Sequence, residues 1–192
     1  RGYEVTYLGI GPDGRVSLEE LEAAITDKTI LISVMMVNNE IGTVQPIKEI
    51  GEIAKKYGIT FHTDAVQALG NVEIDVKELG IDLMSMSAHK IYGPKGIGAL
   101  YVKEGVRIEK LIYGGEQERN LRAGTSDVPS AVGFAKATEI LVKNFNDRSS
   151  SVMKIKKYFI IFLFSVPKRN DAYHPWNELI AFCGSIVFSG SR

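Results

Sequence analysis

Two apolar segments that end in residues of opposite charge constrain the fold of this chain more than any other feature. Residues 59–63 lead into Asp64, and residues 81–87 lead towards Lys90. Asp64 and Lys90 lie 26 residues apart, about the length of a strand, a crossover and a second strand in a parallel sheet. Because parallel neighbours end at the same edge, we expect both residues at one carboxyl edge, where open α/β sheets bind their ligands.

A lysine and a carboxylate at such an edge have a defined chemical use. In a partly dry pocket the pKa of a lysine falls, and its amine can then attack a carbonyl carbon and form a Schiff base. A carboxylate opposite can keep a pyridine nitrogen protonated, which makes an aromatic aldehyde cofactor an electron sink. Spacing alone does not distinguish this pair from two surface residues. The polar groups of HTDAVQ (62–67) and SMSAHK (85–90) favour a ligand, because they lie in apolar surroundings and need partners.

Three segments carry a resemblance to a known family: HTDAVQ at 62–67, SAHKIYGPKGIGALYV at 87–102 and GGEQERNLRAGT at 114–125. They resemble the pyridoxal-phosphate enzymes of the class V aminotransferase group, and within that group the NifS/IscS-type cysteine desulfurases, over about residues 1–141. The resemblance implies an α/β fold, namely part of the large domain of a fold-type I pyridoxal-phosphate transferase. We therefore expect a mostly parallel sheet with flanking helices, with the family's N-terminal part missing.

The resemblance also implies pyridoxal 5'-phosphate as the cofactor and gives roles to individual residues. Lys90 would be the Schiff-base lysine, and Asp64 would pair with the pyridinium nitrogen. Gln67 would hydrogen-bond the phenolic oxygen of the cofactor, and Ser87 and His89 would contact its phosphate.

Two further implied residues lie in segments that composition alone assigns to turns or loops. Residues 38–42, NNEIG, follow a buried strand and are rich in turn formers, whereas the resemblance places Asn39 beside the cofactor. Residues 114–125 are polar and irregular, as in a solvated loop. By the resemblance, Thr125 instead reaches the phosphate of a neighbouring subunit's cofactor, which implies a homodimer.

The implied reaction of the complete enzyme converts L-cysteine to L-alanine. Sulfur passes through a persulfide on a mobile-loop cysteine to an acceptor or scaffold protein, for iron–sulfur clusters or thio-cofactors. The single cysteine, Cys183, lies outside the region of resemblance beside Phe182, so the persulfide role is not assigned to it. We therefore expect no desulfurase activity from this chain. Selenocysteine lyase, another class V aminotransferase, or a truncated product without turnover stay open as alternatives.

A metal site competes for His62, Asp64 and His89, because imidazoles and a carboxylate are zinc ligands. Strand alternation points His62 and Asp64 to one face, but this pair has no second half with ligand spacing. We predict that the chain binds no metal.

Composition and charge exclude several other classes. The 23 basic and 23 acidic residues cancel, so the chain lacks the electrostatic signature of a nucleic-acid or membrane-surface protein. One cysteine excludes an internal disulfide and fits a reducing compartment, the cytoplasm or, in a eukaryote, the mitochondrial matrix. Residues 1–4, RGYE, include neither an initiating Met nor the apolar segment of a signal peptide, so we expect an internal start.

Hydrophobic patterning predicts the remaining elements. Strands are expected at 3–10, 30–37, 59–63, 81–87 and 99–102, and helices from Ser17, from Pro46 to Gly58, around 76–79 and at 129–142. The loop at 93–98 lacks the spacing of a phosphate-binding GxGxxG, so its glycines are expected to let the backbone pass close to the lysine.

The chain is expected to divide near residue 142. Residues 1–142 would form a partial cofactor-binding domain, and residues 143–192 would be a tail that diverges from the family. The apolar run YFIIFLFSV at 158–166 in this tail is too short to span a bilayer.

Overall fold

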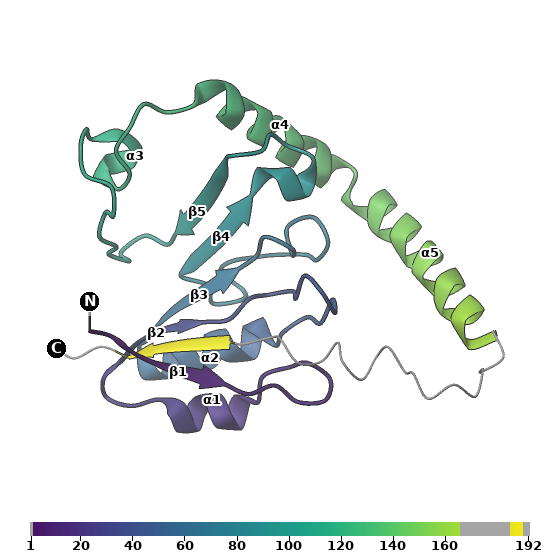
Figure 1. Cartoon of the computed structure of the whole chain (residues 1–192), viewed down its shortest axis with the longest axis horizontal. Coiled ribbons are helices and arrows are strands. Elements are labelled where there is room, and N and C mark those ends of the chain that lie inside the picture. Colours follow the sequence, from purple (N-terminus) through teal and green to yellow (C-terminus); the bar gives the residue numbers. More distant parts are fainter. Residues whose placement is uncertain (1, 166–184, 190–192) are drawn as a thin grey trace.

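A computed structural model describes the backbone of residues 2–165 and 185–189, and its strands form one mixed sheet (Figure 1). The strand order is β1-β6-β2-β3-β4-β5. β2 pairs in parallel with β3, and β3 with β4, while β1 and β2 both run antiparallel to β6. Strands β1 to β4 therefore share one direction, which confirms the predicted mostly parallel α/β sheet. The strands are β1 Glu4–Leu8, β2 Thr29–Ser33, β3 Thr60–Asp64, β4 Leu83–Ser87, β5 Gly98–Val102 and β6 Ser185–Ser189.

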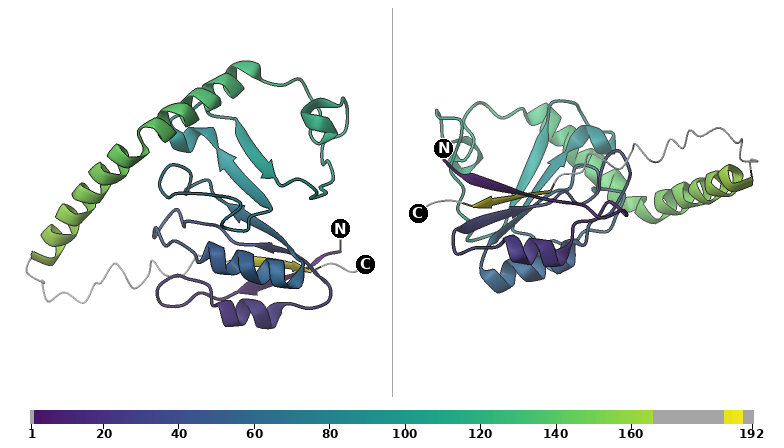
Figure 2. Two further views of the ribbon diagram at one scale, coloured as in Figure 1. Left: turned by 180° about the vertical axis from the view of Figure 1, so that it is seen from behind. Right: turned by 60° about the horizontal axis from the view of Figure 1, so that its bottom comes forward.

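Two helices, α1 (Leu18–Ala24) and α2 (Ile47–Tyr57), lie together against the sheet (Figures 1 and 2). The largest fully buried side chains gather there, among them Leu21, Ile32, Ile50, Phe61 and Ile81. Strand alternation sends the residues between these core positions to the opposite face of the sheet. On that face the side chains of β2 and β3 are only half-buried, which leaves room for polar groups.

Two of the later helical segments lie together at the carboxyl end of β4 (Figure 1). A 3-10 turn, η1 (Ala88–Ile91), follows β4, and α4 (Val128–Lys143) packs beside it. Leu141 of α4 also contacts Gly70, whose added Cβ would lie 2.2 Å from the Leu141 Cδ1 atom. The short α3 (Gln117–Asn120) precedes α4 in the sequence and lies apart from η1, and α5 (Phe145–Ser165) extends away from the sheet (Figure 1). Among the helices described, none combines the length and apolar content needed to cross a bilayer.

The start of α1 and the end of α2 form as their sequences predict. The Ser17 hydroxyl accepts a hydrogen bond from the Glu20 amide at 3.2 Å, which caps α1. The Glu20 carboxylate accepts from the Gly9 amide at 3.2 Å, so it ties β1 to the helix instead of closing a capping box. Gly58 ends α2 in the left-handed conformation at φ 67°.

The structure corrects one predicted helix. Residues 76–80 form a turn, in which the Asp75 carboxylate accepts from the amides of Lys77 and Glu78. Gly80, the last residue of the turn, has a positive φ of 67°. The segment between Asp75 and Gly80 is therefore too short for a helix to propagate.

Strand β6 comes from the segment beyond residue 142 and lies inside the sheet, antiparallel to both β1 and β2. Its residues pair with positions near the start of the chain, such as Ser189 with Glu4. Cys183 lies outside the described residues.

Candidate active site

The carboxyl ends of β3 and β4 bring together most of the predicted site residues. The two strands are parallel neighbours, with Asp64 in register with Ser85. Asp64 is the last residue of β3, Ser87 is the last residue of β4, and η1 then carries His89 and Lys90. The shared edge that the spacing predicts is thus present in the fold.

Asp64 is half-buried and its carboxylate is oriented by the chain that follows it. The Val66 amide donates a hydrogen bond to Asp64 Oδ1 at 2.8 Å. The short turn closed by this hydrogen bond holds the Asp64 carboxylate at the edge of the sheet. Gln67 is half-buried in the same turn, and its backbone oxygen accepts from the Asn71 side-chain Nδ2 at 2.9 Å.

The residues after β4 are more exposed. Ser87 Oγ and His89 Nδ1 lie 2.7 Å apart, while the side chains of His89 and Lys90 face solvent. The described residues therefore do not provide the partly dry pocket that we expected around Lys90. The reason is geometric, because η1 turns out of the sheet directly after β4, with α4 packed beside it and the Ala88 amide bonded to the Ile97 carbonyl.

The glycines after Lys90 act as predicted. An added Cβ on Gly98 would lie 2.7 Å from the Met86 carbonyl oxygen, and one on Gly93 would lie 3.0 Å from the Ala88 carbonyl oxygen. Only glycine allows this close return of the backbone past η1 into β5, which runs antiparallel to β4.

Asn39 and Thr125 lie in exposed segments. The neighbouring Asn38 is buried, and its side-chain oxygen accepts from the amides of Glu40 and Ile41 at 2.8 and 2.9 Å. The NNEIG segment therefore forms a turn built by Asn38, with Asn39 exposed at its surface. Thr125 is exposed after Gly124, whose amide donates to the Gln117 side-chain oxygen at 3.1 Å.

A hydrogen-bonded chain that the sequence did not reveal crosses the same face of the sheet. His62 Nδ1 lies 2.7 Å from Ser33 Oγ on β2, and His62 Nε2 lies 2.9 Å from Ser85 Oγ on β4. Burial lowers the pKa of His62, and the charge of Asp64 offsets part of that effect. The imidazole is therefore neutral near pH 7 and is engaged at both nitrogens. A strand-register alignment would have shown this contact, because Ser33 is directly opposite His62.

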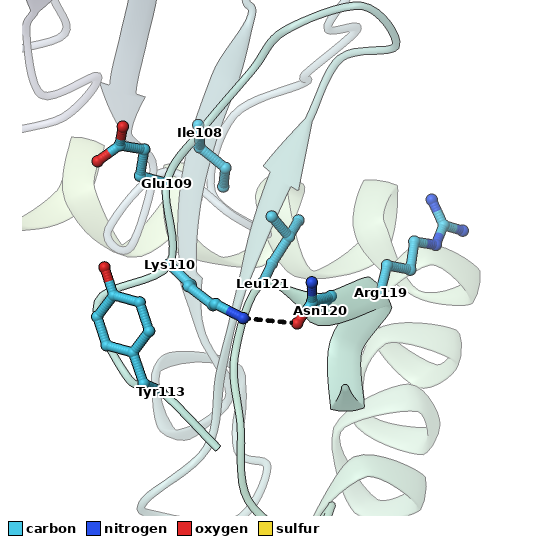
Figure 3. Close-up of a pocket in the computed structure, with 7 residues that line it drawn as sticks. All are labelled: Ile108, Glu109, Lys110, Tyr113, Arg119, Asn120 and Leu121. Atoms are coloured by element: carbon cyan, nitrogen blue, oxygen red, sulfur yellow. Dashed lines mark hydrogen bonds between the residues drawn. The ribbon is translucent and has the colours of Figure 1, made fainter. Parts of the chain in front are cut away.

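A separate hollow of about 430 Å³ lies in the segment around α3, away from the strand edge (Figure 3). Lys110 donates to the Asn120 side-chain oxygen at 2.8 Å, and Tyr113 and Arg119 also line the hollow. Its residues are largely exposed, and none of them is a predicted site residue.

No group of three or more His, Cys, Asp or Glu side chains is arranged to hold a metal ion within the part of the chain that the structure describes. His62 is committed to two serines on neighbouring strands, which uses both of its ring nitrogens.

The donor set at the edge fits pyridoxal phosphate. It combines an accessible lysine amine, a carboxylate held in place by a backbone amide, and hydroxyl and imidazole groups beside them. Fold and edge together define an α/β domain of the kind that pyridoxal-phosphate enzymes use to hold their cofactor. The chain belongs to the class-V aminotransferase family, whose model matches residues 1–175.

Relatives and solved structures agree with this family. The chain is 54% identical over 179 residues to a protein named cysteine desulfurase IscS from Methanosarcina thermophila, covering 93% of this chain and 44% of the relative. It is similar to a solved NifS-like protein with a TM-score of 0.81 and 41% identity, covering 85% of this chain and 45% of that one. A structure titled SspA in complex with cysteine is 49% identical with a TM-score of 0.70, covering 72% and 40%. The chain thus spans less than half the length of these proteins.

Proposed function

We propose that this chain is the cofactor-lysine part of a pyridoxal-phosphate-dependent cysteine desulfurase. The observation that carries the proposal is the placement of Asp64 and Lys90 after neighbouring parallel strands, at one carboxyl edge. The desulfurase names of its relatives support the same reaction class.

The proposed roles follow from the position of each side chain. The Lys90 amine would hold the cofactor through its aldehyde carbon, with the aldehyde oxygen leaving as water, and its exposure leaves it accessible for that attachment. Asp64 would accept a hydrogen bond from the ring nitrogen and keep that nitrogen protonated. The Val66 amide holds its carboxylate in place. When bound, pyridoxal phosphate supplies an electron sink for bonds at the α-carbon of an amino acid. The Gln67 side chain would donate a hydrogen bond to the phenolic oxygen of the cofactor.

The phosphate would be held by groups from two subunits. Ser87 and His89 are already paired with each other and would turn a hydroxyl and an imidazole towards it. The exposed Thr125 would reach the cofactor of a second copy, which makes the functional unit a homodimer. Asn39 would lie beside the ring. Residues 1–142 would hold all of these groups, and residues 143–192 would contribute none.

The proposed substrate is L-cysteine, with a sulfur-acceptor or scaffold protein as partner and the cytoplasm or the mitochondrial matrix as location. The structure of SspA with cysteine supports this substrate by similarity. Selenocysteine lyase or another class-V aminotransferase would use the same edge, so a substrate comparison separates them. For the 192 residues alone we expect no turnover, because Lys90 is open to water among the described residues.

The test is a titration of the purified chain with pyridoxal phosphate, followed by visible absorbance. We expect a new band that Lys90→Ala abolishes and that Lys95→Ala leaves unchanged, since Lys95 is an exposed lysine in the adjacent loop. A band of equal size in the Lys90→Ala protein would overturn the proposal.

Turnover is measured as sulfide released from L-cysteine with excess cofactor and a reductant. We expect none above the Cys183→Ser control. Sulfide that disappears in this control would make Cys183 the nucleophile and would contradict the assignment of no site residue to 143–192.

A further inference from the structure

His62 is a half-buried histidine on which the proposed chemistry places no demand, yet both of its ring nitrogens are engaged. It lies on β3 between Ser33 of β2 and Ser85 of β4, at 2.7 and 2.9 Å. One imidazole thus links three adjacent strands through side chains alone.

A neutral His62 can hydrogen-bond both Ser33 and Ser85. A neutral imidazole has one donor and one acceptor, and each serine hydroxyl can serve as either, so both tautomers complete the chain. On this face β2 and β4 present leucines and serines (Leu31, Ser33, Leu83, Ser85 and Ser87), and Asp64 is the charged neighbour on β3 itself.

The link lies immediately before the carboxyl edge. Backbone bonds continue past it, from the Val34 amide to the His62 carbonyl at 3.1 Å and from the Ala65 amide to the Ser85 carbonyl at 3.0 Å. Asp64 follows His62 by two residues and therefore lies on the same face. A change in how β3 is held against β2 and β4 at His62 is thus transmitted directly to the backbone that carries Asp64.

We propose that His62, through Ser33 and Ser85, is a positioning residue that fixes the carboxyl ends of β2, β3 and β4 so that the Asp64 carboxylate faces the cofactor ring. The proposal rests on the proposed function for the role of Asp64. The arrangement of the carboxylate itself can be tested without cofactor, because the Val66 amide reports on it directly.

The first experiment measures amide hydrogen exchange in the full chain. We expect His62→Leu to speed exchange at Val66 about tenfold, as for loss of one hydrogen bond to a charged group, with little change at Phe61 at the other end of β3. Asp64→Ala removes the acceptor of the Val66 amide and therefore gives the largest acceleration of exchange expected there. Thr60→Val is the matched control, since it removes a hydroxyl from the same face of β3 outside the chain of hydrogen bonds.

If His62→Leu does not fold, the Ser33→Ala/Ser85→Ala double variant takes its place with the same expectation. His62→Gln, which keeps a donor and an acceptor, should restore part of the protection. Unchanged exchange at Val66, or equal acceleration of Val66 and Phe61, would overturn the proposal, because the second result describes a general loss of stability.

The second experiment adds pyridoxal phosphate labelled with ¹⁵N in the ring and reads the shift of that nitrogen by NMR. We expect a protonated ring nitrogen in the wild-type chain, a shift towards the unprotonated value in His62→Leu, and an intermediate value in His62→Gln. Identical shifts in all three would contradict the positioning role. If the wild-type chain takes up no cofactor, the proposed function fails and the Val66 exchange alone decides the role of His62.

Discussion

At the scale of single residues, neighbouring positions on β3 show how one strand serves both the core and the site. Phe61 and Thr63 are fully buried under the helices, while His62 and Asp64 lie half-buried on the opposite face. The polar atoms on the open face are engaged by serines and a backbone amide. The Thr63 hydroxyl on the covered face is not engaged among the described residues, and this predicts an effect on stability.

Thr63 is 0% exposed, and its hydroxyl has no hydrogen-bond partner among the described residues. Because an unpaired buried hydroxyl is destabilising, Thr63→Val should raise the free energy of unfolding by about 1 kcal/mol. Thr29→Val is the matched control, because the buried Thr29 hydroxyl accepts from the Thr26 amide at 2.9 Å. Urea denaturation should show the control to be destabilised by about 1 kcal/mol, and a loss of stability in both variants would refute the explanation.

The lowered pKa of His62 predicts a dependence of stability on pH. Burial, partly offset by Asp64, makes His62 of the folded chain take up a proton at lower pH than in the unfolded chain, where the pKa of histidine is about 6.5. The contribution of neutral His62 to the free energy of unfolding is complete above the pKa of the unfolded state. It is lost as the pH falls towards the lower pKa of the folded state. Urea unfolding between about pH 8 and 5 should therefore show a steeper loss in the wild type than in His62→Gln. Parallel curves would contradict this account.

The common sheet edge of Asp64 and Lys90 could be anticipated from the sequence, but the contacts around it could not. Asp64 and Lys90 follow apolar runs of strand length, so their common edge follows from the spacing. The link from His62 to Ser33 and Ser85 depends on strand register, which adjacent residues in the sequence do not encode. The exposure of Lys90 depends in turn on what packs beside η1.

At the scale of elements, the packing of α2 places a glycine where a helix would normally favour alanine. Gly51 lies in the buried face of α2 beside the turn at 76–80. An added Cβ there would lie 2.2 Å from the Leu79 carbonyl oxygen, which belongs to the backbone. Helix propensity and packing thus make opposite predictions for one substitution.

We expect Gly51→Ala to lower the free energy of unfolding by about 1–3 kcal/mol, although propensity alone predicts a gain of about 1 kcal/mol. The neighbouring Glu52 is exposed, so Glu52→Ala is the control and should stay within about 0.5 kcal/mol of wild type. Both are measured by urea denaturation. A stabilised Gly51→Ala chain would show that α2 does not approach the turn this closely.

Element positions were largely predictable because the apolar runs are long and bounded by Gly, Pro and Ser. The cap at Ser17 and the stop at Gly58 illustrate this. The predicted helix at 76–79 was wrong because a cap at Asp75 and a positive φ at Gly80 leave room only for a turn. Local propensity does not decide between one turn and a helix when the segment is this short.

At the scale of the whole molecule, β6 joins the end of the chain to its beginning. Within the described residues β1 pairs only with β6, and β6 separates β1 from β2. The pairing of Ser189 with Glu4 joins residues that are almost the full sequence apart, so no local pattern could predict it.

Val187 pairs with Thr6 on one side and Ile32 on the other. Val187→Pro removes a backbone donor in a strand with neighbours on both sides, so it should lower the free energy of unfolding by more than about 1 kcal/mol and expose the β1 amides to exchange. Val187→Thr keeps the strand preference and should cost less than about 1 kcal/mol. Undiminished protection of β1 in the proline variant would show that β1 does not depend on β6.

The central claim is that Lys90 is the attachment point for pyridoxal phosphate at the carboxyl edge of the sheet. The direct measurement is reduction of the cofactor-treated chain with borohydride, followed by peptide mass mapping of the stable pyridoxyl label. We predict the label on Lys90, and the same treatment of Lys90→Ala should give none at this edge. A label on Lys95 or Lys103 in the wild-type chain, or no label at all, would contradict the claim.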